Sequence, residues 1–279
     1  MVSQLKQVKE LLRNMDRRAK KALGQHFLVD SSYLDTMLAA AGICSDDTVI
    51  EVGPGLGVLT QELLKNAGRV IAVELDNQLA ENMSKTPGLE VVNADILNTT
   101  PEQLLGDGVS SYKVVANLPY NIAAQVLRRF LESEFQPSKI VVMIQKEVAK
   151  NMMAEPPDMN LLAVGIQTYG KPKVVRKVPP DAFYPRPKVD SAIINIDVYD
   201  KPAVEVSDIE VYFKVARAGF GNKRKQLRNA LANGLALTPK AVEDVLTEAG
   251  IDYQRRAQTL SLEQWAQISR IMEERIDNG

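Results

Sequence analysis

Apolar positions along residues 48–145 recur in short runs that alternate with longer amphipathic stretches. Five of the runs predict β-strands, at residues 48–53, 69–76, 89–95, 112–118 and 139–145. Helical periodicity follows at 56–67 and 77–85 and from about Ala123 onward, and residues 191–199 predict a late strand. Strands that alternate with helices predict a doubly wound, mostly parallel α/β sheet with its active cleft at the carboxyl ends of the strands.

The two ends of the chain have a different pattern. After residue 208 the apolar residues recur only at helical spacing, with Pro239 and Gly250 as punctuation, which predicts a small all-helical domain at 201–279. Residues 1–22 predict a basic helical arm, because Leu5, Val8 and Leu12 are helically spaced among basic residues. Residues 23–200 are then expected to form the catalytic domain.

The strand at 112–118 ends in the tetrapeptide Asn117-Leu118-Pro119-Tyr120, an unusual joint between a strand and a helix. A plain turn would use Gly, Asp or Ser, whereas this joint carries an amide, a stiff proline and an aromatic ring. We therefore expect these four residues to contact a ligand.

A glycine-rich loop follows the first strand, in the sequence EVGPGLGVLT at 51–60. Its glycines allow a sharp turn and a close approach to a ligand. The spacing departs from G-x-G-x-x-G, and Pro54 removes a backbone donor that a diphosphate would use. Glu74 and Asp95 end the next two strands, where a carboxylate can accept ribose hydroxyls. The loop and acids together favour S-adenosylmethionine, although each acid alone could be a helix cap.

Single cysteine and histidine residues, Cys44 and His26, exclude an internal disulfide and a Cys/His zinc cluster, so we expect no metal. Cys44 is expected to be buried at the end of a helical stretch. No apolar run is long enough to cross a bilayer, and the N-terminus is charged where a signal peptide would be apolar. The prediction is a cytoplasmic protein without membrane association.

The formal net charge of −1 conceals strong charge segregation. Basic residues outnumber acidic ones in three segments, 1–21, 171–188 and 214–228. Such segments favour contact with a polyanion, although each could be no more than a solvated basic face.

Together these motifs resemble the KsgA-type rRNA adenine N6,N6-dimethyltransferases that act on the small ribosomal subunit. The resemblance covers nearly the whole chain and includes LGQHFLVD (23–30), EVGPGLGVLT (51–60), VIAVELD (70–76), NADIL (93–97), NLPYNI (117–122), MIQKEVA (143–149) and VPPDAFYPRPKVDSA (178–192). One departure is the short stretch AEPPDMNLLAV (154–164), where similar proteins carry a Lys-x-Tyr-Gly-like sequence.

The resemblance implies a Rossmann-like methyltransferase fold and the donor S-adenosylmethionine. It implies a monomer that dimethylates two adjacent adenosines near the 3′ end of small-subunit rRNA, either free or in a pre-ribosomal small subunit. The matching positions for donor binding are His26, Leu28, Gly53, Glu74, Asp95 and Asn117.

The joint suits methylation of an adenine N6, whose lone pair is delocalised into the ring. The Asn117 side-chain oxygen and the Leu118 carbonyl can accept hydrogen bonds from N6, while Pro119 fixes the turn. Tyr120 is expected to stack on a flipped-out adenine. By resemblance Phe183 would cover the other face of the base, and core packing is the alternative reading for this ring.

We expect the C-terminal helical domain to bind the rRNA backbone. Its sequence FGNKRKQLRNAL (220–231) contains Lys223, Arg224, Lys225 and Arg228 with no acid among them. Helical spacing is expected to put Arg224 and Arg228 on one outer face and Leu227 and Leu231 inward.

Three other functions remain open at this point. The large-subunit rRNA adenine methyltransferases of the antibiotic-resistance type share the motifs and differ in the methylated nucleotide. A non-catalytic ribosome assembly factor could keep the fold, and a nicotinamide oxidoreductase could use a similar glycine-rich loop.

Overall fold

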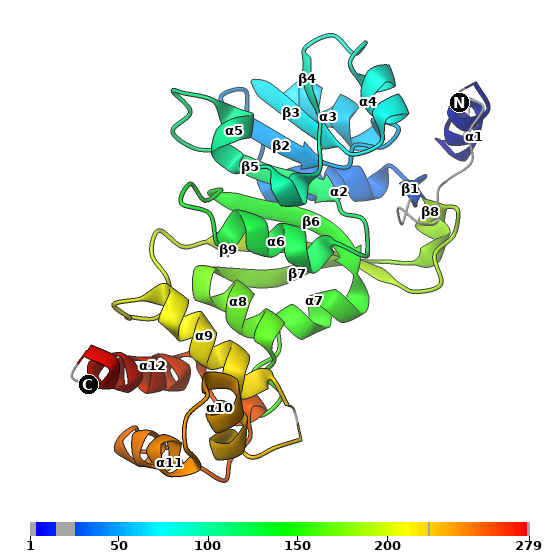
Figure 1. Cartoon of the computed structure of the whole chain (residues 1–279). Helices are drawn as coiled ribbons and strands as arrows, with labels where there is room; N and C mark the ends of the chain where they lie inside the picture. Colours follow the sequence, from blue (N-terminus) through cyan, green and yellow to red (C-terminus); the bar gives the residue numbers. More distant parts are fainter. Residues whose placement is uncertain (1–3, 15–25, 223, 278–279) are drawn as a thin grey trace. The chain divides into compact units, whose positions relative to one another are not determined.

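The computed structural model describes residues 4–14, 26–222 and 224–277 (Figure 1). The chain divides into two compact units, the first formed by residues 1–149 and 171–198 and the second by residues 150–170 and 199–279. Residues 150–170 therefore pack with the C-terminal helices, although the sequence analysis assigned them to the catalytic domain. The charged and proline-containing stretch at 154–164 gave no sign of this exchange.

The first unit combines one large sheet, one two-stranded sheet and flanking helices. Its strands are β1 (Phe27–Leu28), β2 (Thr48–Val52), β3 (Arg69–Glu74), β4 (Leu89–Asn93), β5 (Lys113–Asn117), β6 (Lys139–Gln145), β7 (Gly170–Val178), β8 (Phe183–Tyr184) and β9 (Ser191–Val198). Its helices are α1 (Gln4–Asn14), α2 (Ser32–Ala41), α3 (Val58–Asn66), α4 (Asn77–Met83), α5 (Pro101–Leu105), α6 (Ala123–Leu131) and α7 (Lys146–Met152), the last of which crosses the boundary between the units, with short 3-10 turns η2 (Ile96–Asn98) and η3 (Pro180–Ala182).

The large sheet has the strand order β4-β3-β2-β5-β6-β9-β7. Strands β2 to β6 run parallel to their neighbours, whereas β9 is antiparallel to β6. The predicted mostly parallel, doubly wound sheet is confirmed. The strand order reverses between β2 and β5, and in such sheets the ligand cleft opens beyond the carboxyl ends at that point.

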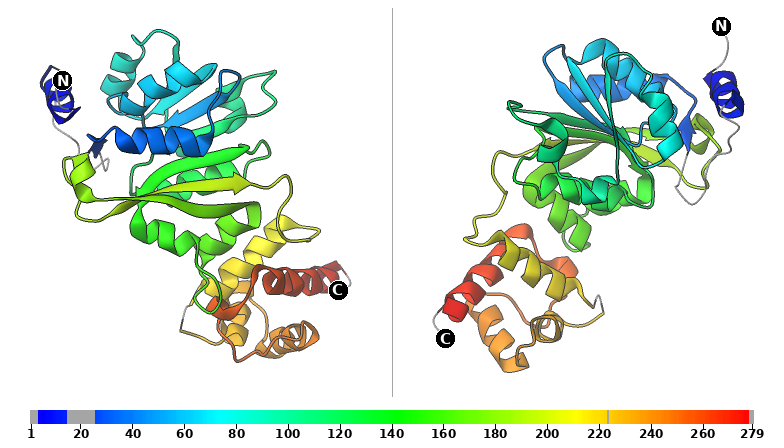
Figure 2. Two further views of the ribbon diagram at one scale, coloured as in Figure 1. Left: turned by 180° about the vertical axis from the view of Figure 1, so that it is seen from behind. Right: turned by 45° about the horizontal axis from the view of Figure 1, so that its top comes forward.

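Helices cover both faces of this sheet, with α2 and α6 on opposite sides (Figures 1 and 2). On the α2 and α3 face, Met37 and Leu63 pack with Val49, Val115 and further β-strand residues in one buried apolar cluster. The buried β-branched side chains explain why the central strands read as continuous apolar runs. This packing fixes the strand ends from which the site is built.

Strand β7 was not predicted from the sequence. It lies at the edge of the sheet, and most of its side chains, including Val174 and Val175, are exposed. Lysines and a proline are typical of edge strands, which need no apolar face and must not pair with other chains. The segment therefore lacks the alternation by which a strand is recognised.

Helix α1 confirms the predicted N-terminal helix over residues 4–14. Its buried side chains, Val8 and Leu12, pack with Phe27, Leu56 and Leu79. The rest of the predicted arm, residues 15–22, lies outside the described residues. The arm is thus anchored on the first unit through one apolar stripe.

Cys44 corrects another expectation, because it is exposed rather than buried. Its backbone N–H donates to the Asp47 carboxylate at 2.8 Å in the turn before β2. The helical stretch that suggested burial ends two residues earlier, at Gly42.

The second unit is helical, as predicted for the C-terminal part of the chain. Its helices are α8 (Leu161–Tyr169), α9 (Ile209–Phe220), α10 (Leu227–Leu235), α11 (Pro239–Glu248) and α12 (Leu262–Asp277), with the 3-10 turn η4 (Ala257–Thr259). Trp265 is fully buried against Gly219 of α9, where an added Cβ would lie 2.3 Å from the indole ring. Glycine at this position allows the two helices to pack closely.

Candidate active site

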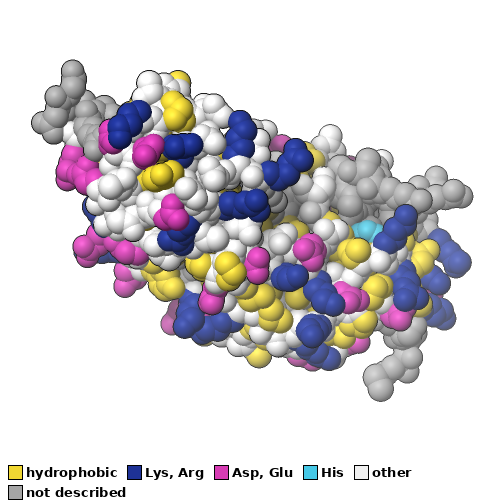
Figure 3. Space-filling model, turned by 90° about the horizontal axis from the view of Figure 1, so that it is seen from below, with side chains coloured by type: hydrophobic (Ala, Val, Ile, Leu, Met, Phe, Trp, Pro, Cys, Tyr) yellow, Lys and Arg dark blue, Asp and Glu magenta, His cyan; other side chains and the backbone are white. Residues whose placement is uncertain are grey.

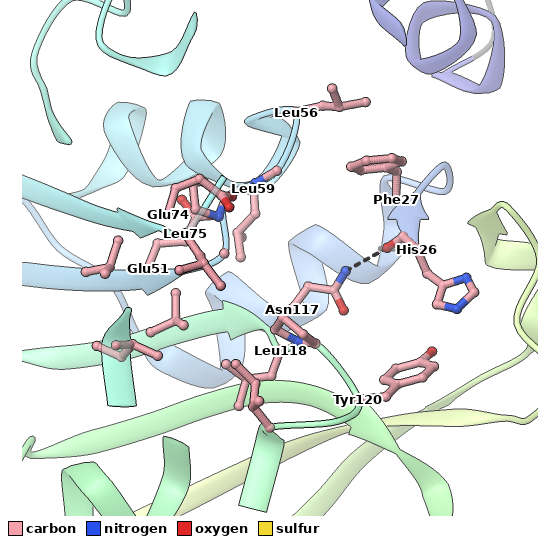
Figure 4. A pocket seen from close by; sticks show the side chains of 18 of the residues that line it. His26, Phe27, Glu51, Leu56, Leu59, Glu74, Leu75, Asn117, Leu118 and Tyr120 are labelled. Atoms are coloured by element: carbon pink, nitrogen blue, oxygen red, sulfur yellow. Dashed lines mark hydrogen bonds between the residues drawn. The ribbon is translucent and has the colours of Figure 1, made fainter. Parts of the chain in front are cut away.

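A cavity opens at the carboxyl ends of β2, β3 and β5, at the point where the strand order reverses (Figure 4). Its walls come from the glycine-rich loop, the residues after β3 and β4, the Asn117–Tyr120 joint and the segment around β1. The sequence analysis placed the cleft at these strand ends, and the structure confirms that position.

The glycine-rich loop depends on left-handed backbone conformations. Gly53, Gly55 and Gly57 have φ angles of 66°, 58° and 77°, which other residues rarely adopt. An added Cβ at Gly57 would also lie 2.9 Å from the Met83 sulfur. The loop can therefore turn from β2 into α3 within a few residues.

Glu74 lies at the end of β3 with its side chain at the cavity wall. Its two carboxylate oxygens accept from the Asp76 N–H at 2.9 Å and from the Gly55 N–H at 3.3 Å. Burial raises the pKa of the Glu74 carboxyl, and these backbone N–H groups oppose the shift. The glycine-rich loop and the end of β3 are thus joined through one carboxylate.

Asp95 also lines the cavity, one strand further along. It has the capping role that the sequence left open as well, since it accepts from the Leu97 N–H at 3.0 Å at the start of η2. Capping uses one carboxylate oxygen, Oδ1, and the Asn98 amide donates to the other. Each carboxylate oxygen can accept a second hydrogen bond, so helix capping by Asp95 is compatible with ligand binding.

Glu51 is a third acid in the cavity wall, and the sequence analysis gave it no role in binding. It is 2% exposed and accepts from the Thr60 hydroxyl at 2.6 Å. Burial, with a smaller contribution from the charge of Glu74, raises the pKa of Glu51 to about 8, despite the opposing hydrogen bond from Thr60. A lone acid inside a buried strand, followed at once by the glycine-rich loop, was the available signal.

The raised pKa of Glu51 predicts a pH-dependent stability. The folded protein holds this proton more tightly than the unfolded chain, so its stabilising effect is full below pH 4.5 and is lost as the pH rises towards about 8. Glu51→Gln keeps the shape without the charge. Its melting temperature relative to wild type should therefore rise between pH 5 and pH 8.5, as measured by calorimetry without ligand. A constant difference would contradict the assignment, and exposed Glu81→Gln controls for the loss of one carboxylate.

The Asn117–Tyr120 joint is held from three directions. The Asn117 side-chain NH₂ donates to the His26 carbonyl at 3.3 Å, so its oxygen is directed elsewhere (Figure 4). The Leu118 N–H donates to the Met143 carbonyl at 3.1 Å. The hydroxyl groups of Tyr120 and Ser191 are hydrogen-bonded at 2.6 Å. These bonds leave the Asn117 oxygen as an acceptor at the cavity wall.

His26 contributes to the tyrosine side of the cavity. Its ring is stacked on that of Tyr120, with 5.3 Å between centroids. Its Nδ1 lies 2.6 Å from the Pro185 carbonyl, and because a carbonyl only accepts, Nδ1 carries the proton. The side chain therefore braces Tyr120 and the segment after β8. Leu28 lines the cavity and also packs in the buried apolar cluster.

Phe183 does not line the described cavity. In β8 it pairs with Leu28 and is 4% exposed inside the apolar cluster, whereas the next residue, Tyr184, pairs with Phe27 and is partly exposed. Successive side chains of a strand point to opposite sides, so only one of the two rings can face outward. The structure favours the alternative reading of core packing for Phe183.

Apolar residues next to the acids were missed by the sequence analysis. Leu75 follows Glu74 and is 53% exposed at the cavity, and Ile96 follows Asp95 and also lines the cavity but is 4% exposed. Phe27 and Leu56 line the cavity beside α1 (Figure 4). A large apolar residue directly after each acid at a strand end could have indicated these surfaces.

The basic residues before α10 differ from their expected arrangement. The helix begins at Leu227, so Arg224 lies in the preceding turn and shares no helical face with Arg228. Arg228 forms an ion pair with Glu243 at 3.3 Å and lies over the Tyr253 ring. The sequence analysis missed Glu243 because it lies 15 positions after Arg228 in the chain. Leu227 and Leu231 are buried as predicted, Lys225 is exposed, and Lys223 lies outside the described residues.

Two absences hold for the described residues. They contain no group of three or more His, Cys, Asp or Glu side chains that could bind a metal ion. None of the described helices is long and apolar enough to span a membrane.

Comparisons with known proteins agree on one family. The family model described as ribosomal RNA adenine dimethylase matches residues 16–274. Proteins named ribosomal RNA small subunit methyltransferase A include one from Dehalococcoides mccartyi that is 50% identical, in an alignment that covers 95% of this chain and 92% of the relative. Another, from Clostridium perfringens, is 38% identical, and the alignment covers 99% of each chain.

Solved structures are similar in fold. A dimethyladenosine transferase from Plasmodium falciparum has a TM-score of 0.71 at 23% identity, covering 91% of this chain and 98% of that chain. The 23S rRNA methyltransferase ErmE has a TM-score of 0.66 at 27% identity, covering 88% and 99%. The family model and the similar sequences show that the chain belongs to the ribosomal RNA adenine dimethylase family.

Proposed function

We propose that this chain transfers methyl groups from S-adenosylmethionine to N6 of two adjacent adenosines near the 3′ end of small-subunit rRNA. Family membership supports the enzyme class, an rRNA adenine dimethylase that uses a methyl donor. The names of the relatives at 37–50% identity support the small subunit as the substrate. The finer claims rest on the cavity and its residues.

The observation that carries the proposal is the charge of the cavity. Its described lining includes Glu51, Glu74 and Asp95 but no lysine or arginine. Glu51 is mainly protonated at neutral pH because its pKa is about 8, so the acidic character of the cavity rests on Glu74 and Asp95. These two acids suit a donor with a positively charged sulfonium and ammonium, whereas the diphosphate of a nicotinamide cofactor would find no lysine or arginine in the described lining. This contrast disfavours the oxidoreductase alternative.

The residues present fit the donor. Glu74 and Asp95 would accept hydrogen bonds from its ribose and adenine, and Leu75 and Ile96 would cover the adenine ring. Gly53 and Gly55 would let the backbone approach its methionine part. When bound, the donor supplies an electrophilic methyl group.

Activation of the target nitrogen is assigned to the joint. The Asn117 oxygen and the Leu118 carbonyl would accept hydrogen bonds from N6, so that its lone pair leaves the ring plane. The bond from the Asn117 NH₂ to the His26 carbonyl supports this orientation of the amide. Tyr120, held by Ser191 and His26, would stack on the base and hold it out of its helix.

After transfer, N6 carries an acidic proton and needs no dedicated base, and a singly methylated N6 keeps one hydrogen for a second round. Phe183 remains a proposed second stacking ring only if its segment moves on RNA binding. Lys225 and Arg224 remain proposed phosphate contacts. The monomeric state also remains a prediction.

The test is methylation of small-subunit rRNA, free and in immature subunits, with the purified protein and S-adenosylmethionine. We expect N6,N6-dimethyladenosine at two adjacent positions near the 3′ end, located by mass spectrometry and primer extension. Methylation of large-subunit rRNA instead would favour the alternative function, that of a large-subunit enzyme such as the 23S rRNA methyltransferase ErmE. Binding of rRNA without any methyl transfer would favour a non-catalytic assembly factor.

A further inference from the structure

The geometry points to a binding surface for the RNA strand that flanks the target adenosine. We infer that Lys9 and Arg13 of α1, with Arg186 and Lys188, contact the phosphates of this strand at the rim of the cavity, and that the Tyr184 ring orients Lys9 for this contact. We call these five residues the rim surface. The inference rests on the proposed function, because it assigns the RNA contacts beside that site.

Helix α1 is fixed to the wall of the cavity rather than free in solution. Val8 and Leu12, four positions apart, are buried against Phe27 and Leu56, which both line the cavity. One face of α1 is therefore occupied by packing. The helix can present charges at a defined place beside the site.

Lys9 is held at the rim by an aromatic ring. Its ammonium lies 5.1 Å from the centroid of the Tyr184 ring, which itself packs against the apolar residues under α1. Such a contact orients the cation and leaves donors for another acceptor. Arg13, one helical turn later, is exposed and has no ion-pair partner among the described residues.

The rim surface is connected to the base-binding part of the cavity by two contacts. The residue after Tyr184, Pro185, accepts the hydrogen bond from His26 Nδ1 at 2.6 Å. The His26 ring stacks on Tyr120. An adenosine held by Tyr120 therefore places its neighbouring nucleotides next to Tyr184.

Further positive charge follows Tyr184 along the chain. Arg186 and Lys188 are exposed, and among the described residues the ion-pair partner of Arg186 is the exposed Asp181, at 2.9 Å. Figure 3 shows the single histidine, in cyan, at the surface with Lys and Arg side chains close to it. Exposed ion pairs are weak, so Arg186 can exchange its partner for a phosphate at little cost.

The opposite side of α1 would repel RNA. There a groove between α1, α2 and α3 is lined by Glu10, Asp35 and Glu62. Glu10 and Glu62 are ion-paired with Lys6 and Lys65, so Asp35 adds the net negative charge. The charge on the two sides of α1 thus differs in sign. This difference selects the side of Lys9 and Tyr184 for a polyanion.

The experiment compares two double variants with the same change of net charge. Lys9→Gln with Arg13→Gln removes two rim charges, and Lys85→Gln with Lys201→Gln removes two exposed charges outside the rim surface. RNA affinity is measured as a function of salt on an oligonucleotide that carries the target adenosines. The slope of log affinity against log salt is negative, and the rim variant should make it less negative by about 1.4 to 1.8, whereas the control should keep the wild-type slope.

A second pair of variants tests the tyrosine. Tyr184→Phe keeps the ring under Lys9 and should bind RNA as wild type does, whereas Tyr184→Ala should lose affinity. Titration with S-adenosylmethionine should give the same Kd for all variants, which also confirms folding. Equal salt slopes for the two double variants would overturn the inference. Absence of methyl transfer by the wild-type protein would overturn the proposed function but leave the slopes to decide the RNA surface.

Discussion

Asn117→Ala is expected to reduce single-turnover methyl transfer by about a hundredfold or more at saturating S-adenosylmethionine. The variant removes the side-chain oxygen proposed to accept a hydrogen bond from N6, and so leaves the lone pair in the ring. The fold loses little, because the amide makes one hydrogen bond of 3.3 Å to the His26 carbonyl. The rate is measured by transfer of labelled methyl groups to rRNA.

Two measurements separate this effect from a general loss of structure. Donor affinity is determined by calorimetric titration, since Asn117 also lines the cavity. Asn66→Ala serves as the control, because Asn66 is an exposed amide at the end of α3 whose only described bond is to the Glu62 carbonyl. A rate for Asn117→Ala within twofold of wild type would refute the proposed activation of N6.

Glu74→Gln is expected to weaken S-adenosylmethionine binding by roughly tenfold to a hundredfold. A hydrogen bond to a carboxylate is worth about 1.5–3 kcal/mol, and the variant removes the charge that strengthens it. Glutamine keeps the size of the side chain but can accept from only one of the Gly55 and Asp76 N–H groups, because these two groups donate to different carboxylate oxygens of Glu74. Calorimetric titration at neutral pH measures the change.

The control for Glu74→Gln is Glu81→Gln, which alters an exposed carboxylate on the neighbouring helix α4. Its donor affinity should equal that of wild type. Unchanged donor affinity in Glu74→Gln would remove Glu74 from the donor site and leave it as the link between β3 and the glycine-rich loop.

The centre of the sheet could be predicted from the sequence because strands β2, β3, β5 and β6 are buried on both faces. Val49 and Val115 belong to apolar runs that admit few other readings. The orientation of β9 could not be predicted, because an antiparallel strand at this position has the same apolar pattern as a parallel one. Strand β7 could not be predicted because it pairs with one neighbouring strand at the edge of the sheet and has no alternating pattern of buried side chains.

The sequence analysis grouped the residues that line the cavity best where these residues directly follow strands. Glu74, Asp95 and Asn117 end or follow parallel strands, so topology alone brings them to one edge. Contacts across long stretches of chain could not be deduced. The partner of Arg228, the burial of Phe183 and the stacking of His26 on Tyr120 all depend on segments that no local pattern connects.

Pairing of β1 with β8 joins His26 to Pro185, which lie 159 positions apart in the chain. The ribosome makes a protein from its N-terminus, so a growing chain that has released β2 to β5 already contains the acids and the joint. It still lacks the strand against which β1 aligns His26 and Phe27. Tyr120 also lacks its hydrogen-bond partner until Ser191 has been synthesised. The cavity is therefore completed late in synthesis. An unfinished chain already contains the acids and the Asn117–Tyr120 joint but lacks the segment that closes the cavity around them.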